Sequence, residues 1–110
     1  MTYLQGALSA SQLLVETPTL LTASAATPYA LLTTDASLSL NADAAFTVTL
    51  PAAPATGRIV DITDRLGLCN TNNIIIDGNM KNINGAATLT MNQNYASVKL
   101  QYNGTQWNII

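Results

Sequence analysis

Residues 46–50 read FTVTL, and this stretch indicates the fold class more clearly than any other part of the chain. Its apolar side chains, Phe46, Val48 and Leu50, alternate with two threonines, which is the period of a strand with one buried face. Two prolines follow within four residues, and proline cannot donate a hydrogen bond to a strand ladder. The segment therefore predicts a half-buried β-strand that ends in a loop.

Similar signals lie on both sides of this strand. Residues 59–64, IVDITD, place Asp61 and Asp64 on opposite faces of a second strand. The run IIID at residues 74–77 is typical of a strand buried on both faces or nearly so. About eight short strands at this spacing predict an all-β domain, either a small β-sandwich or a barrel-like fold. The remaining strand-like runs are YALLTT, SLSLNA, TLTMN and ASVKLQYN, which begin at residues 29, 37, 88 and 96.

The last eleven residues, LQYNGTQWNII, predict a hairpin. Asn103-Gly104 is a preferred pair for a two-residue turn, because both central residues of that turn need positive φ. Tyr102 and Trp107 flank the turn and are expected to be cross-strand neighbours. Trp107 is then expected to close the core. The alternative is that the two rings form an exposed platform for stacking on a glycan.

Residues 1–29 differ from the rest of the chain, because they are rich in Ala, Ser, Thr and Leu and contain two prolines. Residues 4–15 predict a short helix. We interpret residues 1–29 as an extended N-terminal anchoring arm and residues 30–110 as the all-β domain. The alternative is that the arm folds back onto its own domain as an edge strand. The residues expected to bind a partner through the arm are Leu4, Leu8, Leu13, Leu14, Leu20 and Leu21.

The composition limits the partners. Hydrophobic residues make up 48% of the 110 residues and charged residues only 9%, and the net charge is −2. A scattered set of cations predicts no nucleic-acid binding, since that needs several on one face. No apolar run approaches the roughly 20 residues of a membrane span. Low charge favours a chain packed in a permanent assembly, with a small secreted or extracellular β domain as the alternative. The cations are Arg58, Arg65, Lys81 and Lys99.

Few residues are suited to catalysis or metal binding. The chain contains no histidine, which is the commonest general base and metal ligand, and one cysteine, Cys69, which we expect to be buried or half-buried. A calcium site built from Asp64, Asn70, Asn72 and Asp77 fits no recognised loop spacing, so these residues are expected to cap turns instead. The sequence therefore predicts no enzyme activity, no cofactor and no metal.

Three segments together resemble a small β domain found in tailed-bacteriophage virion proteins, such as tail fibres, head fibres and other capsid- or tail-attached proteins. They read FTVTLPAAPATGRIVDITDRLG, TNNIIIDGN and NINGAATLTMNQNYASVKLQYNGTQWNII, and the resemblance covers residues 34–110. It implies a structural module that forms homotrimers about a three-fold axis.

The resemblance and the composition together predict a virion structural protein. We expect a capsid decoration or head-fibre-like protein on the capsid surface, anchored through its arm to the major capsid protein or to another virion protein. The alternative is a tail or tail-fibre component, including a tip that binds a host glycan. An enzyme that degrades glycans is disfavoured, because no pair of carboxylates is placed for that chemistry.

Overall fold

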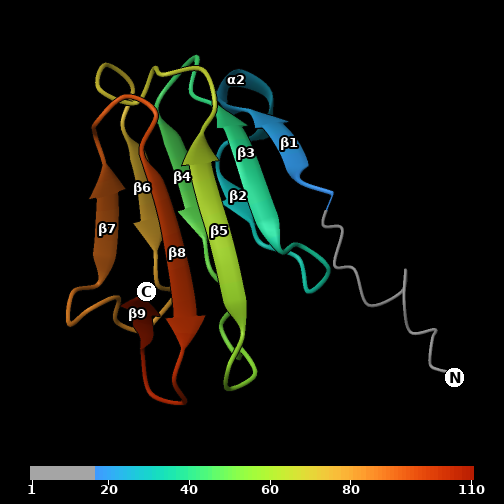
Figure 1. The fold of residues 1–110 in the computed structure, drawn as a ribbon, viewed down its shortest axis with the longest axis vertical. Helices are drawn as coiled ribbons and strands as arrows, with labels where there is room; N and C mark the ends of the chain where they lie inside the picture. Colours follow the sequence, from blue (N-terminus) through green and yellow to red (C-terminus); the bar gives the residue numbers. More distant parts are fainter. Residues whose placement is uncertain (1–16) are drawn as a thin grey trace, which may run out of the picture.

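The computed structural model describes residues 17–110, which form two β-sheets packed face to face (Figure 1). The expected all-β class is confirmed, and its two sheets are those of a sandwich. A single helical turn, α2 (Ala23–Ala26), joins the first two strands. The five-stranded sheet has the order β1 (Thr19–Thr22), β3 (Ser37–Asn41), β5 (Ile59–Asp64), β8 (Ser97–Tyr102) and β9 (Trp107–Ile109). The four-stranded sheet has the order β2 (Tyr29–Ala30), β4 (Phe46–Thr49), β6 (Ile74–Asp77) and β7 (Thr88–Met91).

The chain passes from one sheet to the other after each of its first five strands. As a result β1, β3 and β5 are parallel neighbours in one sheet, and β2, β4 and β6 are parallel neighbours in the other. Parallel neighbours need a long crossover, and here a strand of the opposite sheet supplies it. The last three strands close the domain with antiparallel pairs, β7 on β6, β8 on β5 and β9 on β8.

The core lies between the two sheets and follows the alternation in the sequence. Leu38 and Ile62 face inward from the five-stranded sheet, and Phe46 and Ile76 face them from the four-stranded sheet, all at most 1% exposed. Burying each such side chain contributes roughly 1.5–3 kcal/mol relative to leaving it exposed. In β5 the expected two faces are confirmed, since Val60, Ile62 and Asp64 are buried and the alternate residues are not.

The prediction that the run at residues 74–77 is buried on both faces is wrong. Ile74 and Ile76 are fully buried, but Ile75 points outward and is 37% exposed. The reason is that nothing described in the structure covers the outer face of the four-stranded sheet. The strand is therefore as one-sided as β4, and its sequence lacks the polar residue that usually marks the outer face.

The predicted two-residue turn at Asn103-Gly104 is also wrong. Tyr102 pairs with Trp107, so four residues connect β8 to β9, and of the expected pair only Gly104 has positive φ, at 101°. The Oδ1 atom of Asn103 accepts hydrogen bonds from the backbone N–H groups of Thr105 and Gln106, at 2.9 and 3.0 Å. That side chain stabilises the wider loop, which is an Asx-type turn.

The described part of the expected arm belongs to the sheets. β1 pairs with β3, and β2, which crosses the expected boundary at residues 29 and 30, pairs with β4. For these residues the structure agrees with the alternative given in the sequence analysis, in which the segment folds back onto its own domain as an edge strand. The β domain thus begins at or before residue 19, and the helix expected over residues 4–15 lies outside the described residues. Among residues 17–110, no helix is long and apolar enough to cross a membrane.

Candidate functional site

A buried carboxylate, Asp35, holds the first two strands against the rest of the domain. Its oxygens accept hydrogen bonds from the Thr19 hydroxyl at 2.8 Å, the Tyr29 hydroxyl at 2.5 Å and the backbone N–H of Leu32 at 2.9 Å. The guanidinium of Arg58 donates to the carbonyl oxygen of Asp35 at 2.5 Å. Because these bonds come from β1, β2 and the residue before β5, they join three segments that are separate in the sequence.

These contacts shift two pKa values. Burial raises the pKa of Asp35, but the hydrogen bonds from Tyr29, Leu32 and Thr19 and the charge of Arg58 outweigh burial, so that the pKa lies below its usual range. Burial and the bond to Asp35 raise the pKa of Tyr29 to about 12. Both shifts favour a charged carboxylate beside a neutral phenol. This pair is a structural clamp, because its polar atoms bond to each other and to neighbouring chain rather than to open space.

Two further polar contacts fix the same N-terminal segment. The carboxylate of Asp43 accepts hydrogen bonds from the backbone N–H and the hydroxyl of Ser24, at 2.8 and 2.7 Å. The guanidinium of Arg65 donates to the carbonyl oxygens of Leu21 and Ser39, at 3.3 and 2.5 Å. These contacts tie α2 and β1 to their neighbours, so polar side chains hold an edge strand that is short and only partly buried.

A second buried carboxylate, Asp64, organises the loops at the end of β5. Its oxygens accept hydrogen bonds from the backbone N–H groups of Leu68, Cys69 and Tyr95, at 3.2, 3.0 and 3.0 Å. Burial raises its pKa, but these three bonds outweigh burial and hold the pKa below the usual range. A carboxylate used in this way has few lone pairs left for a cation.

Asp77 and Asn72, which were also considered for a calcium site, likewise form hydrogen bonds with the backbone. The Oδ1 atom of Asp77 accepts from the backbone N–H of Asn79 at 2.9 Å, and the side-chain amide of Asn72 donates to the carbonyl of Ala42 at 3.0 Å. The expectation of turn-capping roles is confirmed for both aspartates. Within residues 17–110, no group of three or more His, Cys, Asp or Glu side chains is placed to hold a metal ion.

Cys69 is fully buried, as expected, and its thiol donates to the carbonyl of Gln93 at 2.8 Å. Burial raises the pKa of this thiol, and the neighbouring Asp64 carboxylate raises it further. A nucleophilic cysteine needs the opposite shift, toward the thiolate. The local chemistry therefore favours a structural role for Cys69.

The aromatic pair of the last hairpin lies in the core. Trp107 is fully buried and Tyr102 is 6% exposed, with their ring centroids 5.4 Å apart and their planes tilted by 53°. Neither ring presents a free face to solvent, so the residues considered for a glycan platform have no stacking surface in this conformation. The expected role of Trp107 in closing the core matches its burial.

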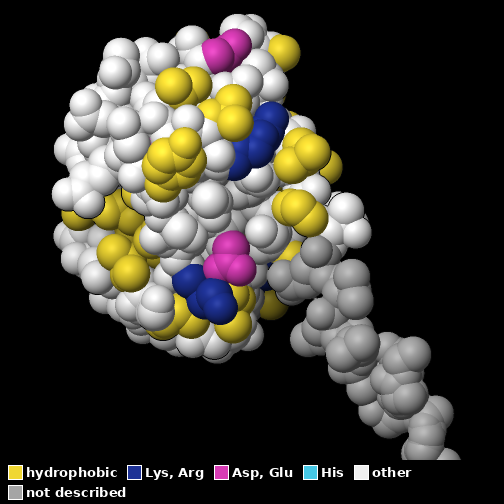
Figure 2. All heavy atoms as spheres, turned by 45° about the horizontal axis from the view of Figure 1, so that its top comes forward, with side chains coloured by type: hydrophobic (Ala, Val, Ile, Leu, Met, Phe, Trp, Pro, Cys, Tyr) yellow, Lys and Arg dark blue, Asp and Glu magenta, His cyan; other side chains and the backbone are white. Residues whose placement is uncertain are grey.

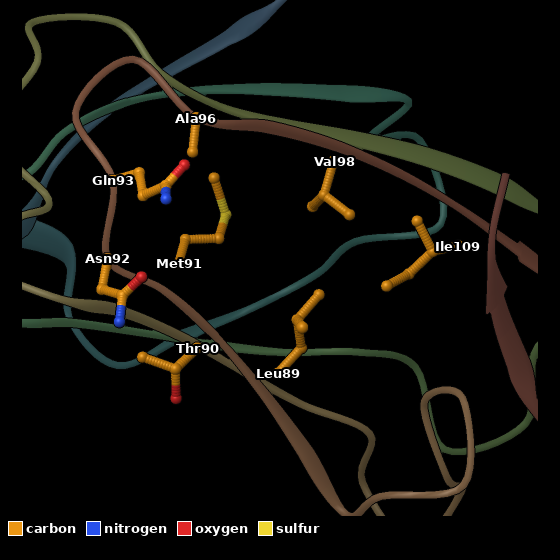
Figure 3. A pocket seen from close by; sticks show the side chains of 8 residues that line it. All are labelled: Leu89, Thr90, Met91, Asn92, Gln93, Ala96, Val98 and Ile109. Atoms are coloured by element: carbon orange, nitrogen blue, oxygen red, sulfur yellow. The ribbon is translucent and has the colours of Figure 1, made fainter.

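A shallow groove of about 190 Å³ opens between the edges of the two sheets (Figure 3). Leu89, Val98 and Ile109 point into the space between β7 and the pair β8–β9, whereas Thr90 points away from it (Figure 3). Met91 forms the floor and is 5% exposed. No charged side chain lines the groove. An apolar, uncharged groove at a sheet edge is suited to a protein segment rather than to a polar metabolite.

The surface carries few charges elsewhere too. On the face shown in Figure 2, charged side chains are few, and apolar groups are scattered among uncharged polar atoms. The outward positions of β4, β6 and β7 in the four-stranded sheet contain a single charged residue. They are Thr47, Thr49, Ile75, Asp77, Thr88 and Thr90.

The leucines expected to bind a partner divide between described and undescribed residues. Leu20 lies on β1 and is 64% exposed, so it is available to a partner. Leu21, the next residue, packs against the core. Leu4, Leu8, Leu13 and Leu14 lie outside the described residues.

The sequence analysis did not predict the groove, because seven of its eight lining residues lie within residues 89–98, which read as a strand, a turn and the next strand, and only Ile109 comes from β9. The one available signal was the pair of isoleucines at residues 109 and 110, which exceed what a three-residue strand needs for its buried face. Comparison with family models and with curated proteins found no match.

Proposed function

We propose that this chain is a structural protein of a tailed-bacteriophage virion, most simply a homotrimeric capsid decoration or head-fibre-like protein on the capsid surface. The observation that carries the proposal is the nearly uncharged exterior of the two-sheet domain. A free monomer with such a surface has little charge repulsion to keep it soluble, whereas a subunit of a permanent assembly buries much of it. The resemblance of residues 34–110 to a phage virion module supports the same reading.

The chemistry of the described residues favours structure over catalysis. The buried carboxylates, Asp35 and Asp64, are both occupied by hydrogen bonds from their own chain. The thiol of Cys69 is buried with its pKa raised. The aromatic rings considered for glycan binding lie in the core, which favours the capsid over a host-binding tip. We assign anchoring on the major capsid protein or another virion protein to the N-terminal segment, and above all to residues 1–16, because residues 19–22 and 29–30 belong to the sheets.

Quantitative mass spectrometry of purified virions tests this proposal. A decoration protein is expected at hundreds of copies per particle, in a fixed ratio to the major capsid protein. A few dozen copies or fewer would place it in the tail or tail fibre instead. Absence from purified particles would reject a virion role altogether, and comparison of full with empty capsids separates a surface protein from one carried inside.

A further inference from the structure

Two loops meet at one end of the sandwich (Figure 1). They are residues 66–73, between β5 and β6, and residues 92–96, between β7 and β8. The backbone N–H of Asn70 donates to Oδ1 of Asn94 at 2.9 Å, and the side-chain amide of Asn70 donates to the carbonyl oxygen of Asn92 at 3.1 Å. These bonds join the two loops into one surface of fixed shape.

Tyr95, in the second loop, has a backbone conformation that tyrosine rarely adopts. It is the third residue of a turn in which the backbone N–H of Ala96 donates to the carbonyl oxygen of Gln93 at 2.9 Å, and its φ is 63°. A turn with positive φ at this position usually carries glycine or asparagine there. The N–H of Tyr95 donates to the buried Asp64 at 3.0 Å, which holds the turn in place. Yet the core does not use the ring, because the residue is 69% exposed.

One face of the Tyr95 ring lies on Gly67. A Cβ added to Gly67 would be 2.9 Å from Cδ2 of the ring and closer still to Cε2 and Cζ. A point that is this close to three adjacent ring atoms lies above the ring plane rather than beyond the ring edge. The ring is therefore flat against the glycine backbone, which has no side chain in the way. Since the residue remains 69% exposed, the opposite face is open to solvent.

The surroundings of this open face are polar and uncharged. Neither loop contains a charged side chain, and their exposed side chains are mostly amides. Nδ2 of Asn94 and Oδ1 of Asn70 have no hydrogen-bond partner among residues 17–110. Amides both donate and accept, so they match hydroxyl groups, which do the same. The core of a protein interface is more apolar than this surface.

We propose that the open face of Tyr95 binds neutral carbohydrate, with a pyranose ring stacked on the phenol ring and its hydroxyl groups bonded to Asn94 and Asn70. The face of an aromatic ring carries negative charge density, which attracts the C–H groups on one side of a pyranose. A glycine at residue 95 would suit the turn but supply no ring. The inference goes beyond the proposed function. The site lies at the opposite end of β8 from the buried rings of Tyr102 and Trp107.

Titration of the isotope-labelled full chain with neutral oligosaccharides, followed by NMR, tests the proposal. The probes are maltotriose, mannotriose, lactose and chitotriose, and at least one of them should shift the signals of the two loops. Tyr95→Gly removes the ring at a φ that glycine adopts readily. It should weaken binding by at least about tenfold, which corresponds to about 1.4 kcal/mol. Its melting temperature should equal or exceed that of the unmodified protein. Tyr95→Phe keeps the stacking face and should retain most of the affinity.

Met80→Gly is the matched control. Met80 is 98% exposed with φ of 75°, so the variant also removes an exposed side chain at positive φ. It follows β6, whose end at Asp77 pairs with Thr88 at the start of β7, so it lies at the other end of the sandwich from residues 92–96. Saccharide binding should be unchanged in this variant.

Four results would overturn the proposal. One is that no probe binds at millimolar concentration, and another is that alginate, an acidic polysaccharide, binds more tightly than every neutral probe. A clear fall in the melting temperature of Tyr95→Gly would mean that the ring is structural. Weaker attachment of Tyr95→Gly to virions that lack the protein, without saccharide binding, would mean that the ring contacts a virion protein. The copy number in purified virions tests the proposed function separately, whichever result is found here.

Discussion

The hydroxyl of Tyr29 lies 2.5 Å from a carboxylate oxygen of Asp35, and this bond joins β2 to the loop that precedes β3. The same carboxylate accepts from Thr19 on β1. A side chain six residues from its partner thus fixes two edge strands at once. β2 has only two residues, so this bond adds a side-chain contact to a short backbone pairing with β4.

Asp35→Ala should therefore lower the free energy of unfolding by about 1–3 kcal/mol, since it leaves donors on three segments without their acceptor. The measurement is a urea or guanidinium unfolding curve, followed by the fluorescence of Trp107. Asp61→Ala is the control, because Asp61 lies on the outer face of β5, and it should cost no more than about 1 kcal/mol. Equal losses for the two variants would show that the Asp35 bonds contribute little.

Stability should fall at low pH. The pKa values of Asp35 and Asp64 are lower in the folded protein than usual, so their contribution is present above the ordinary aspartate pKa of about 3.9 and is lost as the pH falls through the folded values. Unfolding curves between pH 7 and pH 2 measure this loss. In the variant Asp35→Asn, the free energy of unfolding should fall less steeply as the pH is lowered. An unchanged pH dependence in that variant would exclude Asp35 as a source of the loss.

Stability should fall at high pH for the opposite reason. The pKa of Tyr29 is raised to about 12, so its contribution is present below the ordinary tyrosine pKa of about 10 and is lost as the pH rises through about 12. The raised pKa of the Cys69 thiol acts in the same direction. Tyr29→Phe should reduce the dependence between pH 10 and 12, and Tyr95→Phe, at a residue 69% exposed, should leave it intact.

Two variants in the last hairpin compare the stability that comes from a buried ring with the stability that comes from loop hydrogen bonds. Trp107→Ala should cost about 3–5 kcal/mol, because it removes a fully buried ring that packs on Tyr102. Asn103→Ala removes three exposed hydrogen bonds, two from the loop backbone and one to the Asn108 side chain, and should cost about 1 kcal/mol. Melting curves rank the two variants. A small effect of Trp107→Ala would contradict its role in the core and reopen the glycan-platform alternative.

Gly104→Val should be more damaging than Asn103→Ala. Gly104 has φ of 101°, a conformation that β-branched residues rarely adopt, and an added Cβ would lie 3.4 Å from the hydroxyl of Thr56. The expected result is a lower melting temperature with the same fold by circular dichroism. A melting temperature above that of Asn103→Ala would show that the loop relaxes into another turn at little cost.

The sequence predicts the strands well because alternation is local. The apolar Phe46 and Val48 alternate with the polar Thr47, as in a strand buried on one face. In the structure Phe46 and Val48 are buried and Thr47 is only partly buried. The parallel pairing of β1, β3 and β5 depends on contacts between residues about 19 to 24 positions apart, as in Thr19 opposite Leu38 and Leu38 opposite Ile62, and no local pattern encodes that order. The all-β class was therefore predictable from the sequence, but the order and direction of the strands in the two sheets were not.

The same limit applies to the groove and the buried carboxylates. Asp35 follows two threonines in a segment that reads as a polar turn, and its burial depends on Thr19 and Arg58, which are distant in sequence. The apolar content of residues 19–22 was visible, but it fits a detached arm and an edge strand equally well. Only pairing in the folded chain decides between them, and β1 pairs with β3.

Two N-terminal deletions of different length give the last prediction. Removing residues 1–29 deletes β1 and α2, the buried Ala23, and the hydroxyls of Thr19 and Tyr29 that bond to Asp35. It also exposes the edges of β3 and β4 that pair with β1 and β2. The shortened chain should therefore unfold at a much lower temperature or fail to fold.

Removing residues 1–16 takes away none of the described contacts, so Trp107 should keep the blue-shifted fluorescence of a buried indole. Comparison of the two emission maxima, at a protein concentration where both chains are monomeric, separates folding from assembly. Native emission after removal of residues 1–29 would mean that the domain does begin near residue 30 and that β1 is not needed for folding.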